Sequence, residues 1–261
     1  MKEDILQRWS DIVEDYDNYR PAAPDDIITV IKRLAQNEHP GFVVDLGSGT
    51  GGSARAWAGH AREVIGVEPS LEMLNIARER TKSETINYVN RYGNDTGLKD
   101  SVADIVCASS SIHWMEPEST IKEVLRILKN GGLFSFFGPS HPPVSPFLEV
   151  DQQYFDFVDQ IQHFHTGLPE SDKWDWKAYI GHIDENKLFA YRRYFYINQE
   201  MDWGAGDYIN WLKTTNGIHL LLKRQNVDFI QLFNDFRRKI EYHFGTCRQK
   251  CFFVYRIYVF R

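Results

Sequence analysis

The chain has 261 residues, 43% hydrophobic and 25% charged, enough for one large α/β domain with an insertion or a small added cap. Its formal net charge of −6 is not the basic balance expected of a nucleic-acid enzyme, and no run of about eighteen apolar residues suggests a membrane span. Three cysteines and a charged first twenty residues without a signal core indicate reduced thiols in a cytoplasmic setting.

Two amphipathic helices are expected at the start, over 4–19 and 25–36, because apolar side chains recur there at helical spacing. Arg20-Pro21 ends the first helix, since the residue before a proline avoids the α region.

A buried strand over 43–46 then runs into the glycine-rich turn 47–52, and a helix-like segment follows over 53–59. A strand, a tight turn and a helix N-terminus together form a ligand cradle at the carboxyl edge of a parallel sheet.

The turn fits two glycine templates. Gly47, Gly49 and Gly52 match the dinucleotide pattern G-x-G-x-x-G, whereas Gly47, Gly49 and Gly51 match G-x-G-x-G with Asp45 two residues ahead. An anionic pyrophosphate would sit poorly beside that carboxylate. S-adenosylmethionine, which carries an ammonium and a sulfonium but no phosphate, suits Asp45 directly or through the structure of the loop.

A second acid follows at the spacing that an adenosine site requires. The short strand 62–68 ends in Glu68, roughly twenty positions after Gly47, where a carboxylate can accept hydrogen bonds from both ribose hydroxyls. This spacing does not distinguish NAD from S-adenosylmethionine.

The next elements alternate between helix and strand. Ser70 is a plausible N-cap for a helix over 71–80. Strands are expected over 86–92, 104–109 and 133–137, and a helix over 118–128 that Gly131-Gly132 breaks. This alternation predicts a parallel sheet with both faces covered.

The second half interrupts this rhythm. Four prolines, a helix over 147–162 and two tryptophans make 139–187 an expected cap over the pocket, or alternatively a satellite core or a dimer face. A sixth strand over 187–199, helices over 207–214 and 227–242, and a strand-rich end over 252–260 follow.

Three motifs resemble the class I S-adenosylmethionine-dependent methyltransferases: the run 45–51, then 67–70 with Met73-Leu74, then 128–132. Tyr19-Arg20-Pro21 and His113-Trp114 are similar to a small-molecule branch that includes trans-aconitate methyltransferase-like proteins. The class-level resemblance covers roughly 10–138.

The resemblance implies a Rossmann-like fold: a seven-stranded, mostly parallel sheet with helices on both faces, a helical insertion as cap, and an antiparallel last strand, 252–260, between the fifth and sixth. The corresponding units are a cofactor-binding core with lid helices over 1–138, a cap over 139–187, and a C-terminal part over 188–261 that completes the sheet and the acceptor site.

The implied cofactor is S-adenosyl-L-methionine, and the lid helices are expected to fold over its pocket. Tyr19 and Arg20 would lie near its methionine end, and either Asn94 or Asp95 would face the adenine. The expected cofactor-binding residues are Tyr19, Arg20, Asp45, Gly47, Gly49, Gly51, Glu68, Pro69, Met73, Asn94, Asp95 and Ser110.

His113 is the best single candidate for a catalytic base, because it leaves the fourth strand at the open edge and imidazole exchanges protons near neutral pH. The alternative is a hydrogen-bonding role in the pocket wall. Arg192, Arg193 or Arg224 could clamp an acceptor carboxylate, although solvated surface is the favoured interpretation for each. No cysteine or histidine spacing completes a metal site.

The sequence therefore predicts a methyltransferase acting on a small molecule that bears a carboxylate or hydroxyl, without nucleic-acid or membrane partners, as a monomer or homodimer. One alternative is a nicotinamide-dependent oxidoreductase. The other is a catalytically silent protein that retains the cofactor pocket.

Overall fold

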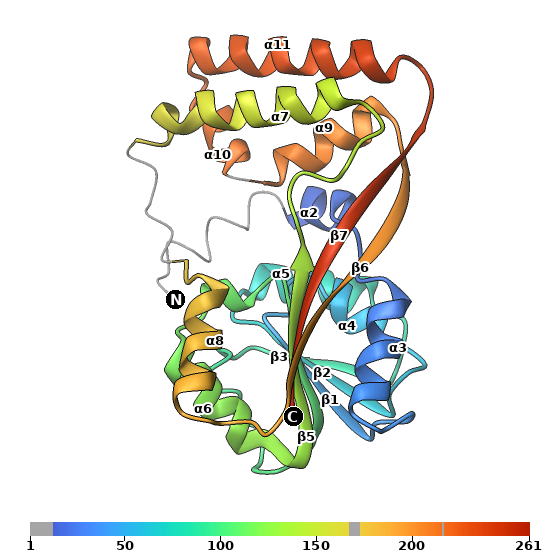
Figure 1. The fold of residues 1–261 in the computed structure, drawn as a ribbon, viewed down its shortest axis with the longest axis vertical. Coiled ribbons are helices and arrows are strands. Elements are labelled where there is room, and N and C mark those ends of the chain that lie inside the picture. Colours follow the sequence, from blue (N-terminus) through green and yellow to red (C-terminus); the bar gives the residue numbers. More distant parts are fainter. Residues whose placement is uncertain (1–12, 167–172, 216) are drawn as a thin grey trace.

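The computed structural model describes residues 13–166, 173–215 and 217–261, so the part of the first predicted helix before Val13 lies outside the described residues. Seven strands form one sheet in the order β3-β2-β1-β4-β5-β7-β6 (Figure 1). β7 runs antiparallel to β5 and β6, and the other neighbours are parallel. The predicted fold class is confirmed, including the reversed last strand between the fifth and sixth.

The strands are β1 (Phe42–Leu46), β2 (Glu63–Val67), β3 (Ile86–Val89), β4 (Ala103–Ser109), β5 (Leu128–Pro139), β6 (Arg192–Trp203) and β7 (Gln249–Phe260). The α-helices are α2 (Val13–Tyr19), α3 (Asp25–Leu34), α4 (Gly52–Ala56), α5 (Leu71–Arg80), α6 (Pro117–Ile127), α7 (Leu148–Gln160), α8 (Trp176–Glu185), α9 (Ala205–Lys213), α10 (Ile218–Lys223) and α11 (Val227–Phe244). Two 3-10 helices, η1 (Ile112–Trp114) and η2 (Ile161–His165), complete the described elements.

Helices cover both faces of the sheet because each buries an apolar stripe. On one face, α3 places Ile27, Ile28 and Ile31 in a cluster with Val43 of β1. On the other face, α6 and α8 pack on the opposite side chains of the same strands. Of the two leading helices, α3 therefore packs on the sheet, and only α2 forms part of the pocket wall.

A second layer of helices, α7, α9, α10 and α11, lies beyond the carboxyl end of β5, and the long strands β6 and β7 reach up to it (Figure 1). The expected cap 139–187 contributes to two places, since α7 packs on α11 in this layer whereas α8 packs on α6 beside the sheet. Tyr179 of α8 donates its hydroxyl to Met115 O at 2.7 Å, which fixes α8 there. The division at 139 and 187 stays a prediction.

Two boundaries differ from the expected ones. The helix predicted over 118–128 ends at Ile127, but the strand expected to begin at Leu133 begins at Leu128, which already pairs with Ala103. Gly131 and Gly132 therefore lie inside an irregular start of β5. The sixth strand begins at Arg192 because the preceding chain still turns, with Leu188 N–H donating to Ile183 O at 3.1 Å. No helix among the described residues is both long and apolar enough to span a bilayer.

Candidate functional site

A pocket lies at the carboxyl ends of β1, β2 and β4, with α2 as part of its wall. Its lining from the sheet edge comes from the turn after β1, from Glu68 to Ser70 after β2, from Tyr92 to Asn94 after β3, and from Ser109 to Ser111 after β4. The helical and C-terminal contribution comes from Tyr16, Asp17, Arg20, Trp114 and Tyr255, among others.

The turn after β1 requires glycine for steric reasons. Gly47 has φ +65°, in the left-handed region, and a Cβ there would lie 2.6 Å from Ser111 Cβ and 2.8 Å from Met115 Cε. At Gly51, with φ +84°, a Cβ would overlap the Tyr88 hydroxyl beneath the loop. Gly47 and Gly51 therefore bring the loop against its neighbours at two positions where no side chain fits.

The amides of this loop are already hydrogen-bonded within the protein. Gly49 N–H donates to Glu68 Oε2 at 3.0 Å, and Gly47 and Ser48 N–H both donate to Val67 O, at 2.8 and 3.1 Å. Gly51 N–H donates to Ser48 O at 2.9 Å. A diphosphate cradle requires loop amides that point at the ligand, and these four do not.

Glu68 is the buried acid of the pocket wall. It is 6% exposed, and its two oxygens accept from the N–H groups of Gly49 (3.0 Å) and Ser70 (2.9 Å). Burial raises the pKa of Glu68 to about 7, although these backbone hydrogen bonds act in the opposite direction. Its carboxylate gains from any ligand that donates hydrogen bonds or brings positive charge.

Asp45, in contrast, lies beneath the loop and is not part of the pocket wall. It is fully buried and accepts from Ser53 Oγ at 2.5 Å and from Cys107 Sγ at 3.7 Å. Burial raises its pKa to about 7, opposed by those two hydrogen bonds, and the charge of Glu68 raises it further. The sequence allowed Asp45 to act on the cofactor by direct contact or through the structure of the loop. The geometry favours the second alternative.

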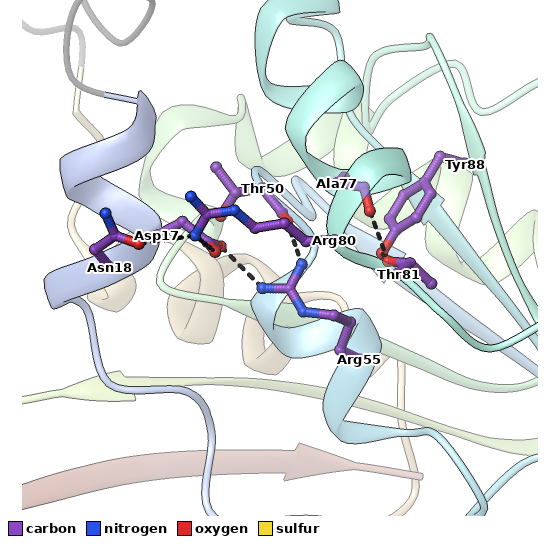
Figure 2. Close-up of polar contacts among 8 residues, drawn as sticks. All are labelled: Asp17, Asn18, Thr50, Arg55, Ala77, Arg80, Thr81 and Tyr88. Atoms are coloured by element: carbon purple, nitrogen blue, oxygen red, sulfur yellow. Dashed lines mark hydrogen bonds and ion pairs between the residues drawn. The ribbon is translucent and has the colours of Figure 1, made fainter.

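α2 is held over the glycine turn by a partly buried ion-pair cluster (Figure 2). Asp17 of α2 accepts from Arg55 of α4 at 2.9 Å and also from Arg80 of α5. Arg55 in turn donates to Thr50 O at 2.6 Å. Burial alone would raise the pKa of Asp17, but hydrogen bonds from Thr50 and Arg55 and the positive charges outweigh it and lower the pKa.

The structure places eight of the predicted residues in the pocket wall: Arg20, Gly47, Gly49, Glu68, Pro69, Met73, Asn94 and Ser110. Five are not part of the wall: Tyr19, Asp45, Gly51, Asp95 and His113. Of the pair left open at the adenine end, Asn94 lines the pocket, and Asp95 closes the turn by donating its N–H to Tyr92 O at 3.0 Å.

Several wall residues were not predicted from the sequence, namely Asp17, Tyr92, Met115 and Tyr255. Tyr255 comes from β7, more than a hundred residues after the rest of the wall, and its hydroxyl donates to Ala22 O at 3.3 Å. The sequence did contain a signal for the burial of Tyr255, because alternate residues of β7 are apolar and Phe253, Tyr255 and Ile257 are all buried on one face.

We call the part of the pocket around Ser110 and Arg20 its far end. Ser110 has an unusual backbone conformation, and Arg20 has unusual hydrogen-bond partners. Ser110 has φ +53°, and its N–H donates to Phe137 O at 2.8 Å, which turns the chain directly after β4. Arg20 donates from Nη2 to Thr214 O at 2.7 Å and lies over the Tyr16 ring, with 5.1 Å between Cζ and the ring centroid.

His113 lies in η1, behind this far end. Its carbonyl accepts from Trp174 N–H at 2.8 Å, and its ring lies 5.1 Å from that of Trp114. Burial lowers the pKa of His113 to about 3, and the charges of Lys173 and Arg20 act in the same direction. The imidazole is therefore neutral at physiological pH.

Residues 44–136 match a protein-family model described as "Methyltransferase domain". The chain is 30% identical over 147 residues to "Probable S-adenosylmethionine-dependent methyltransferase CRG1" of Saccharomyces cerevisiae, which covers 54% of this chain and 50% of that one. It is 27% identical over 181 residues to "Uncharacterized methyltransferase-like C25B8.10" of Schizosaccharomyces pombe, covering 68% and 67%. The chain spans about half the length of most curated relatives it matches.

Among solved structures, a protein described provisionally as a type II methyltransferase from Anaeromyxobacter dehalogenans has a TM-score of 0.71 at 18% identity, covering 93% of this chain and 98% of that one. YcgJ from Bacillus subtilis has a TM-score of 0.52 at 15% identity, over 90% and 97%. The fold is thus the Rossmann-like fold of methyltransferases. The family match over residues 44–136 agrees with the methyltransferase class predicted from the sequence.

Proposed function

We propose that the protein is an S-adenosylmethionine-dependent methyltransferase that transfers a methyl group to a small-molecule acceptor. The observation that carries the proposal is Glu68, a buried carboxylate in the pocket wall that holds the Gly49 amide of the glycine turn. This arrangement offers negative charge where an adenosine-type ligand would bind, and the amides of Gly47, Ser48, Gly49 and Gly51 are already hydrogen-bonded within the protein.

The residues present fit that cofactor. Glu68 offers carboxylate oxygens for ribose hydroxyls, and Ser48 in the same wall has a buried hydroxyl oxygen without a hydrogen-bond partner. Pro69 and Met73 supply apolar wall beside Glu68, and Asn94 supplies an amide at the β3 side of the pocket. These side chains would hold the nucleoside part of the cofactor.

The nicotinamide-dependent alternative has less support. Dinucleotide sites bind the pyrophosphate through backbone N–H groups at the turn and the helix that follows. Here the amides of Gly47, Ser48, Gly49 and Gly51 are hydrogen-bonded within the protein. A diphosphate would also lie beside the acids Asp45 and Glu68, at a cost in electrostatic energy.

When bound, S-adenosylmethionine supplies a methyl group that is already activated on a sulfonium, so the protein mainly positions and desolvates the acceptor. The far end of the pocket suits this task. It lies beneath the helical layer, and its walls are Trp114, Tyr255, Pro139 and the strained turn at Ser110. A pocket end with these walls supports a small acceptor.

We propose that His113, which is not part of the pocket wall, acts beside it as a neutral hydrogen-bonding imidazole. A pKa of about 3 makes it a weak base. An ionised carboxylate acceptor needs no base, whereas a hydroxyl acceptor does. The resemblance to the trans-aconitate methyltransferase-like branch agrees with a carboxylate acceptor and stays a prediction.

Calorimetric titration with S-adenosylhomocysteine and with NAD tests the proposal. We expect S-adenosylhomocysteine to bind with a dissociation constant on the order of micromolar and NAD to bind at least about a hundredfold more weakly, since each tenfold step is about 1.4 kcal/mol. Tighter binding of NAD would overturn the assignment. A screen with radiolabelled methyl donor then separates an enzyme from a silent cofactor-binding protein.

A further inference from the structure

Arg20 is a partly buried cation without a counter-ion among residues 13–166, 173–215 and 217–261. Its guanidinium contacts the Thr214 carbonyl and the Tyr16 ring, and its buried Nε reaches no hydrogen-bond partner in this part of the chain. Burial lowers the pKa of Arg20, and the groups that act against this are the tyrosines 16, 255 and 154. No carboxylate contributes.

The other arginine of the pocket wall shows what a satisfied guanidinium looks like here. Arg55 donates both to Asp17 and to the Thr50 carbonyl, so its charge is compensated within the protein (Figure 2). A buried charge without such a partner costs free energy, and an anionic ligand would offset that cost. Arg20 thus marks a place in the pocket that suits an anion.

The position of Arg20 assigns this anion to the acceptor side. Its guanidinium is tied to Thr214, which follows α9 of the helical layer, and it lies close enough to His113 for its charge to act on that imidazole. Glu68 and the glycine turn, in contrast, reach the same pocket from the carboxyl ends of β1 and β2. Arg20 and Glu68 therefore line one cavity from different elements.

We propose that Arg20 anchors an anionic group of the methyl acceptor, a carboxylate or a phosphate ester, and so selects anionic acceptors over their uncharged analogues. This inference rests on the proposed function, and it moves Arg20 from the expected methionine end of the cofactor to the acceptor. A planar guanidinium suits the role because it can present two parallel N–H donors to a carboxylate or phosphate. The Tyr16 face on one side keeps that plane oriented.

The test uses the full chain saturated with S-adenosylhomocysteine, titrated with succinate, inorganic phosphate and uncharged succinamide by NMR. We expect succinate or phosphate to bind at millimolar concentrations and succinamide to bind at least about tenfold more weakly, as loss of a charge-assisted hydrogen bond predicts. Which of the two anions binds more tightly distinguishes a carboxylate acceptor from a phosphate ester. Equal binding of succinate and succinamide, or no anion binding at about 50 mM, overturns the proposal.

Arg20→Gln is expected to weaken anion binding at least about tenfold while S-adenosylhomocysteine affinity changes less than about threefold. Arg224→Gln is the matched control, because Arg224 also bonds main-chain carbonyls beside the helical layer, those of Phe164 and Thr166. Loss of S-adenosylhomocysteine affinity with unchanged anion binding would assign Arg20 to the cofactor and overturn the proposal. Absence of S-adenosylhomocysteine binding by the wild type is the separate failure of the proposed function.

Arg20→Lys is measured alongside, since Arg20→Gln also removes the bond to Thr214 and could impair folding. The lysine keeps the charge but not the paired donors, so we expect anion binding between that of the wild type and Arg20→Gln. Anion binding by Arg20→Lys equal to that of the wild type would overturn the selection by paired donors. The succinate and succinamide comparison requires no variant and stands even if both variants unfold.

Discussion

The two ends of the pocket carry opposite charges, and burial shifts the pKa values of the ionisable groups at both ends. At the loop end, burial raises the pKa values of Asp45 and Glu68 to about 7. At the far end, burial lowers the pKa values of Arg20 and His113, the latter to about 3. Glu68 at one end and Arg20 at the other therefore hold their charged forms at a cost in free energy without a ligand of opposite charge.

This difference indicates what each end is built to receive. The acids at the loop end gain from a cation, and the bases at the far end gain from an anion. A sulfonium cofactor would supply the positive charge at the loop end, and an anionic acceptor would supply the negative charge at the far end. The comparison is open to test at either end separately.

The largest expected effect on ligand affinity comes from adding one methyl group to the glycine turn at Gly47. In Gly47→Ala the new Cβ would lie 2.6 Å from Ser111 Cβ, so the turn must shift. We expect S-adenosylhomocysteine affinity to fall at least about a hundredfold, measured by calorimetry.

Gly59→Ala is the matched control for Gly47→Ala, because Gly59 has a similar positive φ of +76° but nothing within 4 Å of an added Cβ. Both variants carry the left-handed backbone penalty of about 1 kcal/mol, and only Gly47→Ala adds the overlap. Equal loss in both would show that backbone strain, and not the close approach of the loop, sets the affinity.

A smaller effect is expected from ionisation of Glu68 at the same end. Its folded pKa of about 7 lies above the ordinary value of a glutamate, so the native state binds more protons than the unfolded state between about pH 4 and 7. Stability from this group is thus present at low pH and is lost as pH rises through 7. Wild-type affinity for S-adenosylhomocysteine is expected to rise about tenfold from pH 6 to 8, as the ionised fraction of Glu68 grows.

Glu68→Gln should remove that pH dependence and weaken binding about tenfold at pH 8, measured by calorimetry at four pH values. Glu123→Gln is a control away from the pocket. Glu123 is also buried, but its pKa is lowered because hydrogen bonds and the charge of Arg126 outweigh burial. A pH-independent wild-type affinity would contradict the role given to Glu68.

Local signals in the sequence were sufficient for much of the fold. The helix 71–80 was predicted with its N-cap, and Ser70 Oγ indeed accepts from Met73 N–H at 3.3 Å. The glycine turn and Glu68 were found because their spacing is fixed by one strand, one turn and one helix. The antiparallel last strand was predicted through the resemblance and is confirmed by its pairing with β5 and β6.

What the sequence missed depends on contacts between distant segments. Asp17 meets Arg80 across more than sixty residues, and Tyr255 meets Ala22 across more than two hundred. The sequence left open whether Asp45 acts on the ligand directly or through the loop, because whether a strand-end acid points into a pocket or beneath its loop depends on partners such as Ser53 and Cys107. Pattern and spacing do not encode these directions.

The smallest expected effect belongs to His113 at the far end, and it has the opposite sign to that of Glu68. The folded pKa of about 3 lies below the ordinary value near 6.5, so the unfolded state binds more protons between these values and stability rises with pH there. Going from pH 7 to 5 should cost about 2 kcal/mol of unfolding free energy through this group alone. His113→Gln should remove that loss in denaturant titrations, whereas the exposed His39→Gln should keep it.

The same imidazole reports whether the far end receives an anion. Lys173 and Arg20 contribute to the lowered pKa of His113, so a carboxylate bound at Arg20 would offset part of their effect and raise that pKa. NMR titration of the His113 ring in the S-adenosylhomocysteine complex, with and without succinate, measures this shift, and Arg20→Gln should abolish it. A His113 pKa that does not respond to succinate would mean that the anion binds elsewhere, and the opposition between the two ends would then describe the empty pocket and not its ligands.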